Sequence, residues 1–237
     1  MKPTHRVVGG LIIVVAIGGA IAVSPAAGGS ATRAPEINPA HFTAKVDNPF
    51  MPWRPGTLFH YRSSKPAGAT NPVKVPHRTK MVIGVRCRVV RDVVKVNGRP
   101  QERSFDWYAQ DRRGNVWYFG ENSAVFKHGR WVHNAADSWE AGVHGAQPGI
   151  IMEAHPRRGD VYQQENAPNS KDMAKVLGYV RTVKVPYGTF HHVLVTKEFT
   201  PLEPSIDHDY YARGVGELQE INVKGGEGKT KLVAVHR

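Results

Sequence analysis

Across most of the chain, hydrophobic and polar residues alternate in short runs separated by glycine, proline and asparagine. A two-residue period is typical of antiparallel β-strands that bury one face and leave the other in water. The run 79–96, TKMVIGVRCRVVRDVVKV, places Met81, Ile83 and Cys87 on its apolar face, and Asn97-Gly98 follows as a strong hairpin signal. This run therefore predicts one long, bent strand or two shorter ones.

Two later segments have the same pattern. Residues 178–199, GYVRTVKVPYGTFHHVLVTKEF, predict a strand, a Pro-Tyr-Gly turn and a strand, and residues 217–237 predict a last hairpin around a Gly-rich turn. Helix signals are few: residues 169–177, NSKDMAKVL, combine a capping residue with an acidic first turn, and 134–143 are a weaker candidate. The predicted fold is mainly β, either a single curved antiparallel sheet or an open or partial β-barrel, with one or two short helices.

The N-terminus predicts export. Residues 1–23 combine a basic start with a long apolar run, and small residues follow, which is typical of a signal peptide. The run is also nearly long enough to span a bilayer, so an uncleaved N-terminal membrane anchor is the alternative. Residues 24–41, rich in Ala, Gly, Ser and Pro, predict a disordered tether. Residues 42–237 are expected to form a single antiparallel β domain, either secreted or held outside the cytoplasmic membrane.

The charge balance narrows the partners of an exported protein. The chain has 32 Lys and Arg against 20 Asp and Glu, a net charge of +12. Outside the cytoplasm this favours anionic lipid headgroups or acidic envelope polymers as partners rather than nucleic acid. The basic residues are scattered, so a charged surface that only keeps the protein soluble is also consistent with the pattern. Cys87 is the only cysteine, which excludes an intrachain disulfide and predicts a buried, inert thiol.

The segment 105–122, FDWYAQDRRGNVWYFGEN, predicts a hairpin with aromatic rings on both faces. If residues 111–114 form the turn, Gln110 faces Asn115 and alternate side chains separate into two sets. One set is apolar and typical of a core. The other set mixes rings with carboxylates, which suits a concave ligand site, although an aromatic pair on an exposed sheet is the simpler alternative. The members of this second set are Asp106, Tyr108, Trp117, Phe119 and Glu121.

Acidic residues also gather beside aromatic ones in two later segments, one around Trp139 and one near the turn at Gly214. Since acidic residues are the minority in this chain, their clustering beside rings is the main reason to expect a site there. The candidate ligand-binding residues in these segments are Glu140, Glu198, Glu203, Tyr210 and Tyr211.

Three functions are consistent with these residues. The first is an exported envelope protein that binds a small or amphipathic ligand, such as a lipid, in the aromatic and acidic cleft. The second is a secreted glycan hydrolase or lyase that uses two carboxyl groups; Asp106, Glu121, Glu140, Glu165, Glu198 and Glu203 are its candidate acids. The third is a structural protein that adheres to anionic envelope polymers. The sequence leaves open whether the protein is an enzyme.

The remaining motifs do not favour other chemistry. The chain has no Gly-x-Ser-x-Gly elbow, no HExxH motif and no Cys/His cluster, so neither a serine hydrolase nor a zinc enzyme is predicted. We predict no metal site and no cofactor, while a Ca²⁺ site built from loop carboxylates stays open.

Several blocks resemble a family of exported, mainly actinobacterial proteins. The blocks are DNPFMPWRPGTLFHYR, FDWYAQDRRGNVWYFGE, EAGVHGAQPGIIMEAHPRRGDVYQQE and DYYARGVGELQE, which together extend over residues 47–221. The family has DWYAQDxxGNVWYFGE, PGIIMxAxPxxGD and YYAxGVG in the same order, and it has no established activity. This chain departs from the pattern at Trp53, His144 and Glu217. The resemblance implies export and the extent of the domain, and it implies no reaction.

Overall fold

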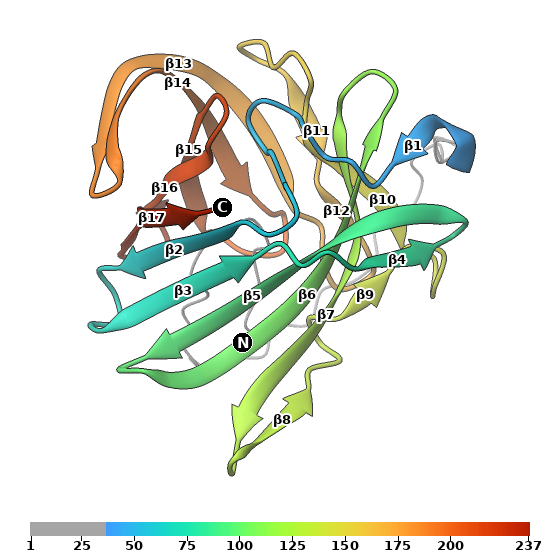
Figure 1. Ribbon diagram of the computed structural model, residues 1–237, viewed down its shortest axis with the longest axis horizontal. Coiled ribbons are helices and arrows are strands. Elements are labelled where there is room, and N and C mark those ends of the chain that lie inside the picture. The colour runs from blue at the N-terminus through green and yellow to red at the C-terminus, as the bar shows by residue number, and fades with distance from the viewer. Residues whose placement is uncertain (1–36) are drawn as a thin grey trace.

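The computed structural model describes residues 37–237, and these residues form one antiparallel sheet of 17 strands (Figure 1). The mainly β fold expected from the alternating pattern is confirmed. The strands are β1 (Phe42–Thr43), β2 (Leu58–Ser63), β3 (Ala69–Lys74), β4 (Thr79–Val82), β5 (Val85–Val96), β6 (Arg99–Asp111), β7 (Val116–Lys127), β8 (Arg130–His133), β9 (Trp139–Glu140), β10 (Gln147–Met152), β11 (Val161–Gln163), β12 (Glu165–Asn166), β13 (Met173–Val185), β14 (Gly188–Phe199), β15 (Ile206–Ala212), β16 (Gly216–Lys224) and β17 (Lys229–His236).

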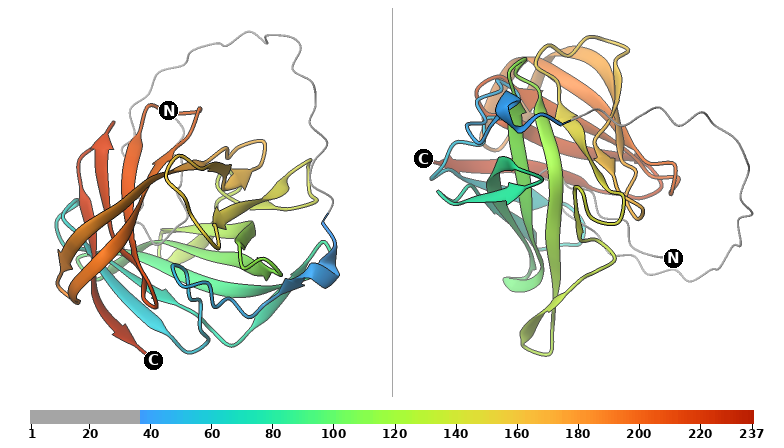
Figure 2. Two further views of the ribbon diagram at one scale, coloured as in Figure 1. Left: turned by 90° about the horizontal axis from the view of Figure 1, so that it is seen from above. Right: turned by 90° about the vertical axis from the view of Figure 1, so that its right-hand side faces the viewer.

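The sheet curls until its two ends meet. Strands β2 to β7 and strands β13 to β17 form two runs of sequence neighbours, and the pairing of β17 with β2 joins them. At the other end, β10 pairs with both β7 and β12, while β11 pairs with β13. These contacts connect the two runs a second time and leave a nearly closed, barrel-like sheet (Figure 2).

Tight turns set the strand boundaries. Asn97 and Gly98, at φ of 50° and 77°, connect β5 to β6 and confirm the hairpin that the dipeptide predicts. Ile83 and Gly84 adopt a similar pair of positive φ angles, 40° and 79°, and divide the run 79–96 into β4 and β5. The prediction that Met81 and Ile83 lie on a buried face is therefore wrong, because the turn leaves them 54% and 42% exposed.

The two helix predictions are wrong. Residues 169–177 lead into strand β13, in which alternate residues such as Ala174 and Val176 are buried. Residues 134–143 form turns and the short strand β9. In both segments, strand pairing outweighs the local capping signal for a helix.

The helical element described in residues 37–237 is one 3₁₀ turn, Pro39–His41, capped by the Asn38 side chain. It lies in the last part of the predicted tether, so that prediction is wrong for residues 37–41. The signal peptide or anchor predicted at 1–23, and the rest of the tether, lie outside the described residues. Within the described part of the chain, no helix is long and apolar enough to cross a membrane.

One face of the sheet points into the enclosed interior, and charge interactions across it identify which face this is. Burial, then the charges of Glu220 and Glu198, and finally the charge of Asp92 on β5 raise the pKa of Glu217 on β16. Three strands, β3, β2 and β17, separate Asp92 from Glu217 along the sheet. They can act on each other only across the interior, so the face that carries Asp92 and Glu217 is the inward one.

Candidate functional site

The hairpin of β6 and β7 has a different register from the one predicted. Its turn runs from Asp111 to Asn115, because the Asp111 backbone N–H donates to the Asn115 carbonyl at 2.9 Å and Asp111 Oδ1 accepts from the N–H groups of Arg113 and Asn115. Gln110 therefore pairs with Val116 rather than with Asn115. A one-residue shift moves every side chain of the second strand to the opposite face.

This shift exchanges the aromatic residues of β7 between the two faces. Tyr118, instead of Trp117, lies opposite Tyr108, and the two rings stack with their centroids 4.9 Å apart. Trp117 and Phe119 face the other way and make edge-to-face contacts with Phe42, at 5.8 and 5.5 Å. The prediction that Trp117 and Phe119 belong to the acidic face is therefore wrong.

A β-bulge then restores the predicted position of Glu121. The register shifts between Asp106 and Tyr108, and Gly120 on the bulge has φ of 128°. An added Cβ at Gly120 would lie 2.3 Å from the carbonyl oxygen of Trp139, so only glycine fits there. Beyond the bulge, Glu121 pairs with Asp106.

Asp106, Tyr108 and Glu121 are thus neighbours on the inward face. The Ser104 hydroxyl donates to Asp106 at 3.0 Å, and the Tyr118 hydroxyl donates to its other oxygen at 3.3 Å.

The later candidates are distributed over several places. Glu198 on β14 accepts from Thr196 Oγ1 at 2.5 Å, and Tyr211 on β15 donates to Asp209 at 3.3 Å; both are buried on the inward face. Tyr210 is half-buried on the opposite face of β15, and Glu203 lies in the turn between β14 and β15. The structure therefore joins Glu198 and Tyr211 to the acidic interior, and it leaves Tyr210 and Glu203 outside it.

The interior holds more acidic residues than the sequence analysis selected. Among the described residues, Arg88 is the one buried basic residue, and its guanidinium donates to backbone carbonyls at one end of the sheet. The pair Asp207 and Asp209, two positions apart on one strand, is a sequence signal for a shared face. Glu165, a candidate acid of the glycan hydrolase, is one of these buried residues. The additional buried or half-buried acidic residues are Asp92, Glu102, Asp137, Asp172, Asp207, Asp209, Glu217 and Glu220.

Burial and repulsion between neighbouring carboxylates raise the pKa values of acidic residues in this interior. Burial, followed by the charge of Asp92, raises the pKa of Asp106 well above its usual value. Burial, followed by the charge of Glu165, does the same to the pKa of Glu121. The pKa of Asp92 rises from 3.8 to about 7, mainly through burial. These side chains therefore retain protons at pH values where exposed carboxyl groups are ionised.

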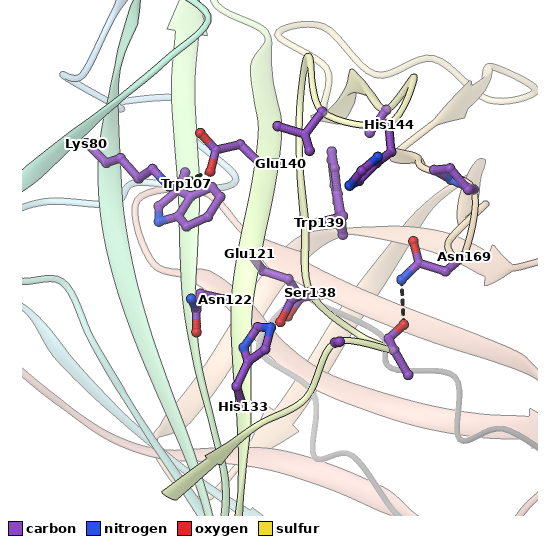
Figure 3. A pocket seen from close by; sticks show the side chains of 15 residues that line it. Lys80, Trp107, Glu121, Asn122, His133, Ser138, Trp139, Glu140, His144 and Asn169 are labelled. Carbon is purple, nitrogen blue, oxygen red and sulfur yellow. Dashed lines mark hydrogen bonds and ion pairs between the residues drawn. The ribbon is translucent and has the colours of Figure 1, made fainter.

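A pocket of about 490 Å³ opens beside Glu121 (Figure 3). This volume lies within the usual range of small-molecule sites, about 300–1,000 Å³. Strands β4, β6, β7, β8 and β9, the loops on either side of β9 and the loop between β12 and β13 contribute residues to its wall. The lining residues are Lys80, Trp107, Glu121, Asn122, His133, Ala135, Ala136, Ser138, Trp139, Glu140, Val143, His144, Ala146, Pro168 and Asn169.

The pocket places a cation on an indole ring at its rim. Lys80 Nζ lies 3.4 Å from the centre of the Trp107 ring and 2.6 Å from Glu140 Oε2. Glu140, the acidic residue predicted beside Trp139, is therefore part of the pocket and is paired with Lys80. Such a geometry combines an ion pair with a cation–π contact.

The inner wall of the pocket carries two polar groups without partners in the described part of the chain. Glu121 Oε2 and Trp139 Nε1 have no hydrogen-bond partner there, although Glu121 is only 3% exposed and Trp139 is buried. A buried polar group normally has a partner, since leaving it without one costs about 1–3 kcal/mol. Both groups belong to residues that line the pocket, and both atoms are themselves buried.

Residues 37–237 contain no group of three or more His, Cys, Asp or Glu side chains arranged to hold a metal ion.

Comparison with known proteins gives distant structural similarities. A putative exported protein with a YmcC-like fold from Bacteroides fragilis is 14% identical, with 79% of this chain and 99% of that chain covered and a TM-score of 0.41. A putative lipoprotein from Parabacteroides distasonis is 10% identical, with 79% and 98% covered and a TM-score of 0.41. No protein-family model and no curated protein matches the sequence. The family resemblance of the sequence blocks therefore stays a prediction.

Proposed function

We propose that the protein is an exported envelope protein that binds a small amphipathic ligand in the pocket beside Glu121. The N-terminal pattern of the sequence supports export. The pocket supports ligand binding, because its wall combines the rings of Trp107 and Trp139 with a small number of polar groups. The observation that carries the proposal is the pocket itself, about 490 Å³ in volume, whose lining residues include Glu121 and the two tryptophans.

Ligand capture tests this proposal. The purified protein, incubated with an extract of envelope lipids and small molecules, is expected to retain a compound that native mass spectrometry detects. Glu121→Gln keeps the side-chain volume and is expected to reduce retention. Trp107→Ala is expected to do the same, because the pocket loses one aromatic wall. Trp117→Ala is a matched control, since Trp117 contacts Phe42 on the outer face and does not line the pocket.

The proposal is wrong if the wild-type protein retains no compound, or if the pocket variants retain as much compound as the control. Circular dichroism and a melting curve for each variant separate a loss of binding from a loss of folding.

The glycan hydrolase needs one ionised carboxylate beside one protonated acid. Among its candidate acids, burial raises the pKa of Asp106 and of Glu121, and the charges of Glu165 and Asp106 both add to the rise at Glu121. Residues 37–237 offer no further observation that favours this reaction, so ligand binding stays the proposal.

A specific feature of the β13–β14 hairpin supports a second function, adhesion to an anionic envelope surface. From Met173 to Lys197 the chain contains four Lys or Arg residues and no Asp or Glu. Arg181 and Lys184 are exposed, and Tyr187 at the tip is 39% exposed. Exposed basic and aromatic side chains together suit a surface of anionic lipid headgroups.

Vesicle co-sedimentation tests the adhesion. The protein is expected to bind vesicles that contain phosphatidylglycerol and to dissociate as salt is raised, because salt screens exposed charges. The double variant Arg181→Glu, Lys184→Glu is expected to lose most of this binding. The same reversal at Lys127 and Arg130, exposed on the β7–β8 hairpin, is the control. Equal binding by both variants, or binding insensitive to salt, would contradict the adhesion.

A further inference from the structure

The outer face of the sheet carries a cluster of arginines outside the pocket. On β6, Arg103 and Phe105 alternate with the inward-facing Asp106, so both side chains point away from the acidic interior. Arg91 on β5 pairs with Phe105 and shares this outer face. Arg78, which precedes β4, reaches the same ring from the side of β4. Arg78, Arg91 and Arg103 form the arginine cluster, and none of the three lines the pocket.

Aromatic rings hold two of these guanidinium groups in place. The guanidinium carbon of Arg78 lies 4.5 Å from the centre of the Phe105 ring, and that of Arg103 lies 5.0 Å from it. Arg103 also lies 4.7 Å from the centre of the Trp131 ring, which itself contacts Phe126. Since both guanidinium carbons lie within 5.0 Å of one ring centre, they are no more than twice that distance apart. Cation–π contacts restrict each side chain in advance, which lowers the entropy cost of binding a ligand.

The cluster is not neutralised by carboxylates on its own face. In residues 37–237, Arg78, Arg91 and Arg103 form no ion pair and no side-chain hydrogen bond. The charge of Arg91 acts on the inward carboxyl of Asp92, its neighbour in sequence, but as the last of the causes that shift that pKa. Burial, followed by the charges of Arg91 and Arg78, lowers the pKa of Arg103. The three cations therefore repel one another, and an anion placed among them would relieve this repulsion.

Further basic residues continue the cluster across the outer face. Lys74 on β3 pairs with Arg91, and Lys95 lies four residues farther along β5 on the same face. Arg62 on β2 is in register with Lys95 through the β3 residue between them. Strands β17, β2, β3 and β5, which lie side by side in Figure 1, contain a single acidic residue, Asp92, and it points inward. The outer face of these strands thus carries positive charge along its width.

We propose that this outer face binds a linear polymer that carries oxyanions, phosphate or carboxylate groups, and that the arginine cluster is its anion-binding site. Guanidinium groups bind both kinds of oxyanion through paired N–H donors. Basic residues repeated across the face suit a ligand whose charges repeat along its length. The site is separate from the pocket and from the β13–β14 hairpin, so the inference goes beyond the proposed function.

A lipid bilayer is another source of phosphate groups, and the face fits it less well. A surface that binds a bilayer usually adds exposed apolar side chains, which enter the boundary between headgroups and acyl chains. Among the described residues, the exposed large hydrophobic side chains lie outside β17, β2, β3, β5 and β6. Phe105 and Trp131 are half-buried and already contact guanidinium groups. The face therefore favours a polymer that is bound by its charges.

Two polymers test the site: polyphosphate, which carries phosphate groups, and polygalacturonate, which carries carboxylates. Biolayer interferometry with the full chain is expected to show binding of at least one polymer, and the tighter of the two identifies the preferred oxyanion. Neutral dextran is expected not to bind. Binding of neither anionic polymer, or equal binding of dextran, would overturn the inference.

Variants locate the binding. The double variant Arg78→Gln, Arg91→Gln is expected to weaken polymer binding by at least about tenfold, because charge-assisted hydrogen bonds are lost. Arg157→Gln, Arg158→Gln is the matched control, since it removes two exposed arginines from the loop between β10 and β11. Equal weakening in both double variants would overturn the site. Loss of binding to phosphatidylglycerol vesicles in the first variant, with polymer binding unchanged, would assign the cluster to a membrane and overturn the polymer.

A conservative variant separates guanidinium recognition from charge alone. Arg78→Lys, Arg91→Lys keeps both charges but loses the planar, forked donors, so polymer binding is expected to weaken by about threefold or more. Wild-type affinity in this variant would show that any cation serves, and would overturn an anion-binding site built on guanidinium groups.

A measurement on the wild-type protein applies even if the variants do not fold. Phenylglyoxal modifies accessible arginines, and peptide mass spectrometry identifies which residues react. Saturating polymer is expected to slow the labelling of Arg78, which is exposed, and to leave Arg157 and Arg158 reacting at the same rate. Labelling of Arg78 that is insensitive to the polymer would overturn the site, and it would leave the ligand pocket intact because Arg78 does not line that pocket.

Discussion

The replacement Asp92→Asn tests the acidic interior through stability. Asp92 lies on β5 and accepts a hydrogen bond from Asn71 Nδ2 at 2.9 Å, and Asn71 is fully buried. Although part of the residue reaches solvent, this contact shows that the carboxyl itself is inside. The substitution keeps the shape of the side chain, and the new amide oxygen can accept the same hydrogen bond.

The size of the effect follows from the pKa. Burial is the main cause that raises the pKa of Asp92 from 3.8 to about 7, with a further contribution from Glu102. Each pKa unit corresponds to about 1.4 kcal/mol, so ionised Asp92 costs the folded state up to about 4 kcal/mol above pH 7. Allowing for the relaxation of neighbouring groups, we expect Asp92→Asn to stabilise the protein by about 2–4 kcal/mol at pH 8.

The sign of the pH dependence is fixed by linkage. Between about pH 4 and pH 7 the folded protein holds a proton on Asp92 that the unfolded chain has released, because the folded-state pKa is the higher one. The contribution of Asp92 to the stability of the folded protein is therefore most favourable at acidic pH, and this contribution is lost as the pH rises from about 4 to about 7. Relative to the variant, the wild type is expected to lose about 2 kcal/mol between pH 5 and pH 7.

Urea denaturation followed by tryptophan fluorescence at pH 5, 7 and 8 measures these differences. Glu203→Gln is the control, because Glu203 lies in the turn between β14 and β15, outside the acidic interior, and its removal should leave the pH dependence unchanged. If Asp92→Asn is no more stable than the wild type at pH 8, and both have the same dependence on pH, the account of the buried carboxyl groups is refuted.

Two further predictions concern the bulge and the thiol. Gly120→Ala is expected to destabilise the protein by at least about 2 kcal/mol in urea denaturation, because its methyl group would lie 2.3 Å from the Trp139 carbonyl oxygen. Gly129 is also at positive φ but has open space around it, so Gly129→Ala should cost less stability. Equal losses of stability in the two variants would contradict the steric argument. Cys87 is expected to resist iodoacetamide at pH 8 until urea unfolds the protein, because burial raises the pKa of its thiol; rapid labelling of the folded protein would show that the thiol is accessible.

Much of the fold was predictable from local pattern. A period of two residues identifies strands, and the dipeptide Asn97-Gly98 identifies a hairpin, because both depend on backbone geometry within a few residues. The buried state of Cys87 followed from the same alternation. The helix predicted at 169–177 failed because a cap and an acidic residue are weak signals beside the pairing of β13 with β14 over its whole length.

The candidate site was predictable only in part. Asp106, Tyr108 and Glu121 were placed on one face, and Glu140 was associated with Trp139, and the structure has these arrangements. The register of β7 was not predictable, because it depends on the Asp111 side chain closing the turn one residue later than expected.

Sequence alone determined that this chain forms antiparallel strands, since the alternation of polar and apolar residues is a property of each strand by itself. Only the tertiary structure decided that carboxyl groups from β5, β6, β7, β14 and β16 share one interior. The closure of the sheet brings these strands together, and closure depends on pairings such as β7 with β10 and β11 with β13, between segments far apart in sequence. The same closure places Glu121 between an acidic interior and an open pocket, so no single segment carries that information.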